Sequence, residues 1–529
     1  MRLPKGVSSG DFSKALGEFA SVVGKDWVFS SDEDVAMYDD AYTPFFGEPE
    51  LQLVPGAAVA PAKVEEVQAV VRIANKYKVP LYPVSTGRNL GYGGSSPSLS
   101  GSVIVDLKRM NRILEVNVKE GYMVVEPGIN FMELYRHFQT NEVPYLLSPP
   151  QPGWGSPIGN GLEHGTGPAA GDNFSMVKGL EVVLPNGELL RTGMGAVPNS
   201  KLWQNYAYGY GPYIDGMFSQ SNFGIVTKAG FWLVPKPEVD QAFSVTSMKT
   251  EDMQPLIDAL LQMRLQGVLY TWGIGSPIRE SMSTNDGRRP YGVPQVQTLN
   301  RRRDGGTPAE WDKLGQDNNI AAVRGTGSVR GPAGVVKAQL EYARTVFSAM
   351  PGVTYTEGKP NLHRGDGTEA PSLQAFGLLA VQGSNHGHFY FSPMLRPNAK
   401  DIFELNDVIR NVMLDAGDVD MLDNYGWSSG RTTAYPKALM ILMEFLVTDD
   451  IALNRRRRDL WKKLVQACGQ HGFAEYRAPV AFADEVMNQY SFNNHSLRRF
   501  HESIKDAIDP NGILAPGARG IWPKHLRNA

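Results

Sequence analysis

One ten-residue segment, 85–94, constrains this chain most, because four of its residues are glycine and it directly follows a predicted strand. It reads Ser-Thr-Gly-Arg-Asn-Leu-Gly-Tyr-Gly-Gly. Glycine adopts positive φ freely and lets backbone N–H groups approach a ligand closely. Consecutive N–H groups form a concave anion site that suits a pyrophosphate. The segment matches neither G-x-G-x-x-G nor a Walker loop, so its residues alone favour a phosphate site and an ordinary surface loop equally.

The N-terminal half alternates between helical and extended patterns around this segment. Valines and alanine recur at helical spacing over residues 64–74, and Pro80 ends that helix because proline fixes φ and lacks an N–H donor. The Asn186-Gly187 step lies between two apolar runs and predicts a hairpin. Strands are predicted at 81–84, 102–106, 122–126, 180–184 and 188–191.

The composition changes near Pro235-Lys236-Pro237, where the glycine-rich part of the sequence ends. We predict an α+β protein with a first domain at 1–238, whose core spans about 50–238. A second domain, the cap, is predicted at 239–472, with helices at 253–265 and 335–350. Residues 473–529 return to short segments punctuated by glycine and proline, and we expect them to rejoin the first domain.

Charge and composition exclude several classes of function. The net charge is −3 and the pI is near 6.3, so nothing draws the chain to nucleic acid or to an anionic membrane. We interpret Arg455–Arg458 as a solvated helix face and Arg301–Arg303 as a surface loop. The longest apolar run, 438–447, contains Glu444 and is too short to span a bilayer. Cys468 is the single cysteine, which excludes an internal disulfide and a c-type haem motif. With no signal-peptide pattern in residues 1–12, we expect a cytoplasmic enzyme.

A second informative segment, 383–393, reads Gly-Ser-Asn-His-Gly-His-Phe-Tyr-Phe-Ser-Pro. If it is a strand, His386, His388 and Tyr390 share one face because side chains alternate. An H-x-H pair can bind a metal only with further ligands from elsewhere. We predict no metal site, and hydrogen-bonded structural histidines are the alternative from the residues alone.

Several motifs, taken in chain order, resemble the vanillyl-alcohol oxidase and eugenol oxidase family. They cover most of residues 15–237 and 450–523, and the region between is less similar. The matching segments are 83–94, 155–160, 180–187, 208–222, 475–477 and 509–517. The resemblance implies a two-domain PCMH-type FAD-binding fold with an antiparallel-sheet cap that lines the substrate cavity.

The resemblance also implies FAD as the cofactor, bound covalently through an 8α-histidyl bond at His388. His386 is an alternative attachment point, and Tyr390 is another, because the related 4-cresol dehydrogenase uses a tyrosyl bond. The remaining cofactor-binding residues implied by the resemblance are Pro83, Ser85, Thr86, Gly87, Arg88, Asn89, Gly91, Gly93, Gly94, Pro127, Gly128, Gly155, Ser156, Gly159, Asn160, Gly224, Ile225, Val226 and Arg477.

A phenolate site is the third implication of the resemblance. A phenol has a pKa of about 10, so its ionisation at neutral pH needs hydrogen bonds and a nearby cation. The family places two tyrosines and an arginine there, at positions that match Tyr92, Tyr476 and Arg477. Neighbours on a regular strand point to opposite sides, so Tyr476 and Arg477 can converge only if the backbone twists or ends there. Where relatives carry an aspartate, this chain has Gln151, which cannot act as a carboxylate base.

The function implied is an FAD-dependent oxidase of para-substituted phenols, such as 4-alkylphenols, 4-allylphenols or 4-hydroxybenzyl alcohols. The benzylic carbon would give hydride to the flavin through a quinone methide, and O₂ would be reduced to hydrogen peroxide. A dehydrogenase that passes electrons to a separate cytochrome is one alternative, and a flavin-fold binding protein without turnover is another. The expected partners are the phenol, O₂ and a second copy of the chain in a homodimer or higher homo-oligomer.

Overall fold

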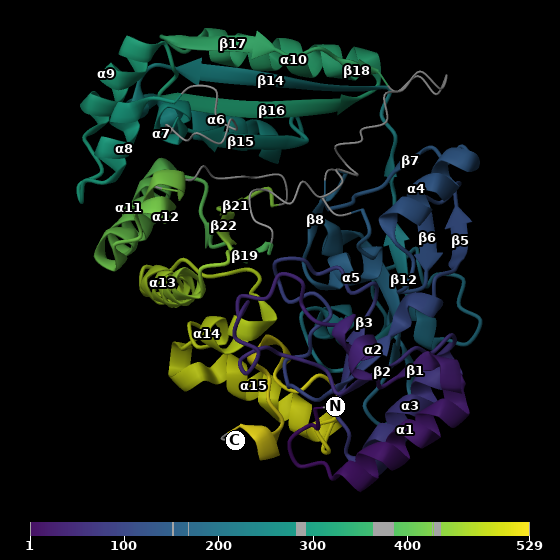
Figure 1. The fold of residues 1–529 in the computed structure, drawn as a ribbon. Helices are drawn as coiled ribbons and strands as arrows, with labels where there is room; N and C mark the ends of the chain where they lie inside the picture. The colour runs from purple at the N-terminus through teal and green to yellow at the C-terminus, as the bar shows by residue number, and fades with distance from the viewer. Residues whose placement is uncertain are drawn as a thin grey trace.

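The computed structural model describes residues 2–150, 153–167, 169–281, 292–362, 386–425, 427 and 435–527. Gln151 therefore lies outside the described residues, as do residues 426 and 428–434 of the predicted cap. Helices and sheets are mixed along the chain, as Figure 1 shows. Among the described residues, no helix combines the length and apolar character needed to cross a membrane.

The first sheet holds the strand that leads into the glycine-rich segment. Its order is β1 (Val28–Phe29), β2 (Ala57–Val59), β4 (Val103–Asp106) and β3 (Leu81–Val84), with β2 and β3 parallel to β4. Helices α1 (Ser9–Val23) and α3 (Val64–Tyr77) lie beside one another against this sheet (Figure 1). The apolar positions of α3 point into the core, which confirms the helix predicted before Pro80.

The second sheet is antiparallel, in the order β11 (Leu189–Arg191), β10 (Val177–Val183), β12 (Ile225–Trp232), β6 (Tyr122–Val125) and β5 (Ile113–Asn117). Helix α4 (Phe131–Thr140) packs its apolar side into the same hydrophobic cluster. The hairpin predicted at Asn186-Gly187 joins β10 to β11, with Gly187 at φ 82°. Strand β10 starts three residues earlier than the sequence predicted.

The third sheet belongs to the predicted cap and is also antiparallel. Its strands are β15 (Thr271–Gly275), β16 (Val323–Gly331), β14 (Val239–Ser247) and β17 (Val353–Glu357), and β18 (Asn361–Leu362) pairs with β14. Figure 1 shows this sheet with α10 (Ala333–Ser348) at the top, away from the first two sheets. Helix α6 (Met253–Leu265) has the predicted bounds, and α10 is shifted two residues toward the N-terminus. Three further helices complete this part: α7 (Pro277–Glu280), α8 (Pro294–Asn300) and α9 (Pro308–Asn318).

Between the sheets lie two short antiparallel ladders, β19 (His388–Phe391) with β22 (Met443–Leu446) and β20 (Met394–Leu395) with β21 (Leu439–Met440). Phe389 and Phe391 point away from the His388 face and are buried among aromatic rings, including Phe445 and Trp461. Burying such large rings holds the strand in one register. The flanking helices are α11 (Ala399–Ala416), α12 (Val419–Tyr425), α13 (Ile451–Gln470), α14 (Ala483–Met487) and α15 (Phe492–Ile508).

The arginine run in α13 is the predicted solvated face only in its first half, where Arg455 and Arg456 are exposed. Arg457 and Arg458 are only 6% and 7% exposed. Glu48 lies 2.6 Å from the Arg458 guanidinium and 2.7 Å from that of Arg455. Arg457 donates a hydrogen bond to the main-chain oxygen of Leu446. The run therefore ties α13 to the N-terminal segment, because a buried guanidinium needs a carboxylate or carbonyl partner.

The C-terminal segment returns to the first sheet. Leu81 in β3 donates to the main-chain oxygen of Ile513 and accepts from Ala515, both at 2.7 Å. Lys505 is fully buried, lies 2.7 Å from Asp509, and donates to the main-chain oxygens of Asn222 and Leu514. These contacts place residues 505–515 beside the strand that enters the glycine-rich segment.

Candidate active site

The glycine-rich segment follows β3 as a tight loop. Gly87, Gly91, Gly93 and Gly94 have φ values of 66°, 78°, 120° and 56°, a region that residues with a Cβ rarely adopt. An added Cβ at Gly91 would lie 2.7 Å from the Tyr390 ring. Gly91 is therefore required twice, by the turn itself and by close approach to β19.

A second group of candidate cofactor residues lies against this loop. An added Cβ at Gly159 would lie 2.6 Å from Ser85 Oγ, so the two glycine-containing loops touch. Ser156 donates a 2.7 Å hydrogen bond to the main-chain oxygen of Pro127. Gly128 approaches the backbone at Leu107, where no side chain fits. The structure thus brings the candidates from 83–94, 127–128 and 155–160 together.

The cofactor-binding candidates Gly224, Ile225 and Val226 are instead involved in core packing. An added Cβ at Gly224 would collide with Val182, so core packing alone accounts for this glycine. The side chains of Ile225 and Val226 point into hydrophobic clusters. Only their backbone atoms are available to a ligand.

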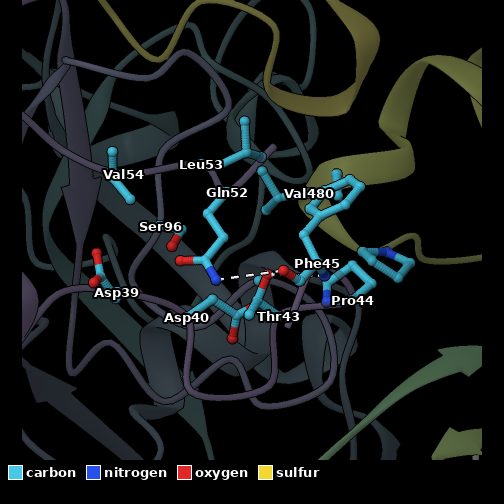
Figure 2. A pocket seen from close by; sticks show the side chains of 13 residues that line it. Asp39, Asp40, Thr43, Pro44, Phe45, Gln52, Leu53, Val54, Ser96 and Val480 are labelled. Atoms are coloured by element: carbon cyan, nitrogen blue, oxygen red, sulfur yellow. Dashed lines mark hydrogen bonds between the residues drawn. The ribbon is translucent and has the colours of Figure 1, made fainter. Parts of the chain in front are cut away.

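A small pocket lies against the glycine-rich loop (Figure 2). Asp39, Asp40 and Ser96 contribute polar atoms to its wall, and Gln52 donates a 3.3 Å hydrogen bond to the main-chain oxygen of Phe45. Burial raises the pKa of Asp40 to about 6. Because the neighbouring carboxylates repel anions, this pocket does not suit a pyrophosphate.

His388 is buried on the face of β19 that meets the loop. Its ring lies 4.5 Å from that of Tyr390 and 5.1 Å from that of Tyr42, between ring centroids. Neither ring nitrogen has a hydrogen-bond partner among the described residues. Burial lowers the pKa of His388 to about 4, so the ring is neutral at pH 7. A neutral imidazole with unpartnered nitrogens beside a glycine loop fits the histidyl attachment of FAD.

The alternative attachment residues have other contacts. His386 stacks on Phe46, with 3.7 Å between centroids, and its Nε2 lies 2.7 Å from Asp449. Tyr390 shares the His388 face, as the alternation predicted, and its ring lies 5.0 Å from that of Tyr92. Burial is the main cause that raises the pKa of Tyr390, so its hydroxyl stays protonated. The described part of the chain contains no group of three or more histidine, cysteine, aspartate or glutamate side chains that could hold a metal.

The three candidate phenolate ligands converge. The Arg477 guanidinium lies 4.1 Å from the centre of the Tyr92 ring and donates a 2.6 Å hydrogen bond to Asn89. Residue 475 forms an isolated β-bridge with Pro393 and Tyr476 lies in a bend, which confirms that the backbone turns at this step. Burial alone would lower the pKa of Arg477, but Tyr476, Tyr92 and Glu163 raise it, so the cation is retained.

Sequence reasoning assigned no role to three polar residues beside this cluster. Ser392 follows His388 and Tyr390 on the same face, so the alternation that paired those two also points to Ser392. Its Oγ lies 3.4 Å from the Tyr92 hydroxyl and 3.3 Å from a Glu475 carboxylate oxygen. Glu163 pairs with Arg519, and this cation and Arg477 lower the pKa of its carboxyl despite burial. No sequence signal links Glu163 to Arg519.

Comparison with known proteins agrees with this arrangement. Residues 55–193 match the FAD binding domain family. The chain is 33% identical to the 4-cresol dehydrogenase [hydroxylating] flavoprotein subunit of Pseudomonas putida, over 98% of this chain and 97% of that protein. It is 32% identical to the 4-ethylphenol oxidase of Gulosibacter chungangensis, solved with isoeugenol, with a TM-score of 0.80 over 99% of this chain and all of that one.

A substrate-bound p-cresol methylhydroxylase structure also has a TM-score of 0.80, at 30% identity, over 98% of this chain and 99% of that one. These matches confirm the α+β, PCMH-type FAD-binding fold and an FAD-dependent oxidoreductase. The chain belongs to the vanillyl-alcohol oxidase and p-cresol methylhydroxylase family of flavoproteins, whose characterised relatives here oxidise para-substituted phenols.

Proposed function

We propose that this chain is an FAD-dependent oxidase of 4-alkylphenols, 4-allylphenols or 4-hydroxybenzyl alcohols. The observation that carries the proposal is the buried, charged Arg477 packed against Tyr92 and next to Tyr476. Burying a cation without a carboxylate bonded to it is costly, and an anionic ligand offsets that cost. A phenolate supplies the anion, and the tyrosine hydroxyls supply its hydrogen bonds.

Ionisation of the phenol is the step that these residues assist. A phenolate is far richer in electrons than the neutral phenol, so its para-benzylic carbon releases hydride more readily. Donors fixed in advance around the developing charge lower the barrier without reorganisation during the reaction. Bound FAD supplies the acceptor for the hydride. The oxidised substrate is a quinone methide, which takes up water or rearranges.

We further propose that FAD is attached covalently at His388 and that O₂ is the electron acceptor. The buried imidazole with its unpartnered nitrogens supports the attachment. Among the relatives that are similar over nearly the whole chain, one is named an oxidase and another a dehydrogenase flavoprotein subunit. A cytochrome-linked dehydrogenase is therefore the second candidate, with its haem on another chain.

Steady oxygen consumption by the purified holoenzyme separates these two candidates. We expect 4-ethylphenol to drive oxygen uptake with equimolar peroxide. The matched control is 4-ethylanisole, in which a methyl group blocks ionisation, and we expect it to be inert. Turnover that needs an added dye or cytochrome, with no oxygen uptake, would favour the dehydrogenase.

The role of Gln151 in proton transfer stays a prediction, because this residue lies outside the described residues. If the family's aspartate serves proton transfer, Gln151→Asp restores a group worth roughly two to four orders of magnitude when well placed. We expect the variant to favour hydroxylated and alcohol-derived products, with a pH dependence that the parent lacks. Identical product ratios and pH profiles on one alkylphenol and one hydroxybenzyl alcohol would place residue 151 outside the proton path.

A further inference from the structure

A buried carboxylate is linked to the phenolate cluster through one serine. The Glu475 side chain accepts a 2.7 Å hydrogen bond from the main-chain N–H of Ser392, and Ser392 Oγ lies 3.3 Å from the same oxygen. Ser392 Oγ is also 3.4 Å from the Tyr92 hydroxyl. Both Oγ distances exceed those of strong O–H···O bonds, as is common in active sites before substrate binds.

Few groups around Glu475 stabilise the negative charge of its ionised form. The residue is 5% exposed, and its second carboxylate oxygen has no hydrogen-bond partner in the described part of the chain. The charge of Glu475 acts on the buried thiol of Cys468 on α13 and on the hydroxyl of Tyr490. The Tyr490 hydroxyl donates to the main-chain oxygen of Glu475 rather than to its side chain. Burial raises the pKa of Glu475 to about 8.

An isolated buried carboxyl of this kind is expensive to keep, because its ionised form lacks a cation and its neutral form leaves an oxygen unpartnered. A glutamine would pack in the same space without a charge. The serine connects the carboxyl to the hydroxyl that faces the candidate phenolate site, and this connection gives a reason for an ionisable group.

We propose that Glu475 receives the proton that a bound phenol loses, by way of Tyr92 and Ser392. The inference rests on the proposed function. The phenol O–H bond breaks and its proton passes to the Tyr92 oxygen, the Tyr92 proton passes to Ser392 Oγ, and the Ser392 proton passes to the Glu475 carboxylate. Three O–H bonds break and three form, and no electrons move between molecules. Glu475 is a positioning residue, because it acts on the substrate only through Ser392 and Tyr92.

The charges favour this transfer. Before it, the negative charge lies on a buried carboxylate that has no cation partner among the described residues. After it, the charge lies on the phenolate beside Arg477. The relay needs an ionised acceptor, so substrate ionisation through it increases as pH rises through the pKa of Glu475.

Proton release on phenol binding tests this pathway directly. The holoenzyme is mixed anaerobically with 4-ethylphenol at pH 9 in a weak buffer containing a pH indicator, and the rate of flavin reduction is followed from pH 6 to pH 10. In the parent we expect no net proton release, because the proton stays inside the protein, and a reduction rate that increases with pH through an apparent pKa near 8. In Glu475→Gln any phenolate must lose its proton to solvent, and we expect a reduction rate at least tenfold lower at pH 9, without the pKa near 8.

Two further variants keep the test decisive. Ser392→Ala removes the linking hydroxyl but keeps the main-chain N–H that binds Glu475, and we expect it to reproduce the glutamine variant. Tyr490→Phe removes the hydroxyl bonded to the main-chain oxygen of Glu475, and we expect the parent profile.

The outcomes separate the relay from the proposed function. If 4-ethylphenol reduces the parent flavin and both Glu475→Gln and Ser392→Ala keep the parent rates, pKa and proton balance, the relay is wrong and the proposed function stands. If no 4-alkylphenol reduces the parent flavin, both are wrong.

Discussion

At the scale of single residues, the site depends on two buried ionisable groups held in opposite ways. Arg477 keeps its charge because aromatic hydroxyls and Glu163 surround it. Burial drives Glu475 toward its neutral form, and no cation in the described part of the chain offsets that effect. Both lie within three residues of one another, at the bend that ends the bridge with Pro393. Sequence comparison identified Arg477, but the state of Glu475 depends on burial by distant segments, which no local pattern encodes.

Arg477→Ala should lower phenol oxidation far more than it lowers stability. Loss of one charged donor to a developing oxyanion costs about 3 kcal/mol, a hundredfold or more in rate. Arg477→Lys should recover only part of the rate, because an ammonium lacks the planar fork. The measurement is kcat/KM for 4-ethylphenol, with the exposed Arg499→Ala on α15 as the matched control. Equal kcat/KM in the parent and Arg477→Ala would refute the phenolate assignment.

Glu475→Gln should change the pH dependence of stability. The ordinary pKa of the carboxyl is 4.5 and the folded value is about 8. Between these pH values the folded protein binds a proton that the unfolded chain has lost, so the free energy of unfolding decreases as pH rises, by at most about 1.4 kcal/mol per pH unit. The Glu475→Gln variant lacks this pH dependence. Its free energy of unfolding should therefore rise relative to that of the parent from pH 5 to pH 8. If the parent and Glu475→Gln differ in free energy of unfolding by the same amount at pH 5 and at pH 8, the raised pKa of Glu475 is contradicted.

His388→Ala should release the flavin. We expect the yellow chromophore of the parent to stay with the protein in SDS and that of the variant to separate from it. His386→Ala is the matched control, because its ring has its own contacts with Phe46 and Asp449. Flavin that stays bound to denatured His388→Ala would move the attachment to His386 or Tyr390.

At the scale of elements, β19 and the residue after it contribute three residues of the candidate site. Its alternation sends Phe389 and Phe391 into the core and His388, Tyr390 and then Ser392 toward the glycine-rich loop. This period of two could be read from the sequence, and it predicted the shared face of His388 and Tyr390 correctly. Sequence patterns failed for the second half of the arginine run in α13, because the buried Arg458 is paired with Glu48, some four hundred residues away in sequence.

Glu48→Gln should therefore destabilise the protein. It leaves the buried Arg458 without its carboxylate, and breaking one side of a buried pair costs about 3 kcal/mol. The exposed Glu50→Gln is the matched control, with an expected change near zero. The measurement is urea denaturation of the holoenzyme. A Glu48→Gln midpoint equal to that of the parent would show that α13 does not depend on this contact.

At the scale of the whole molecule, the candidate site forms where three parts of the chain meet. The loop after β3 brings Tyr92, and β19 brings His388, with Ser392 directly after it. The C-terminal segment brings Glu475 to Arg477, and Lys505 and Asp509 fasten that segment to the first sheet. The sequence allowed the fold class to be predicted, and it also supplied candidate site residues, because each motif is local. The links between motifs, such as Ser392 with Glu475, arise only from packing.

Anaerobic reduction of the bound flavin by 4-ethylphenol and by its methyl ether is the most direct test of the central claim. The account predicts that the flavin absorbance near 450 nm is lost with the phenol at neutral pH, and that the ether leaves it unchanged because it cannot form the anion that Arg477 and the two tyrosines bind. Equal reduction by both compounds, or by neither, would contradict it.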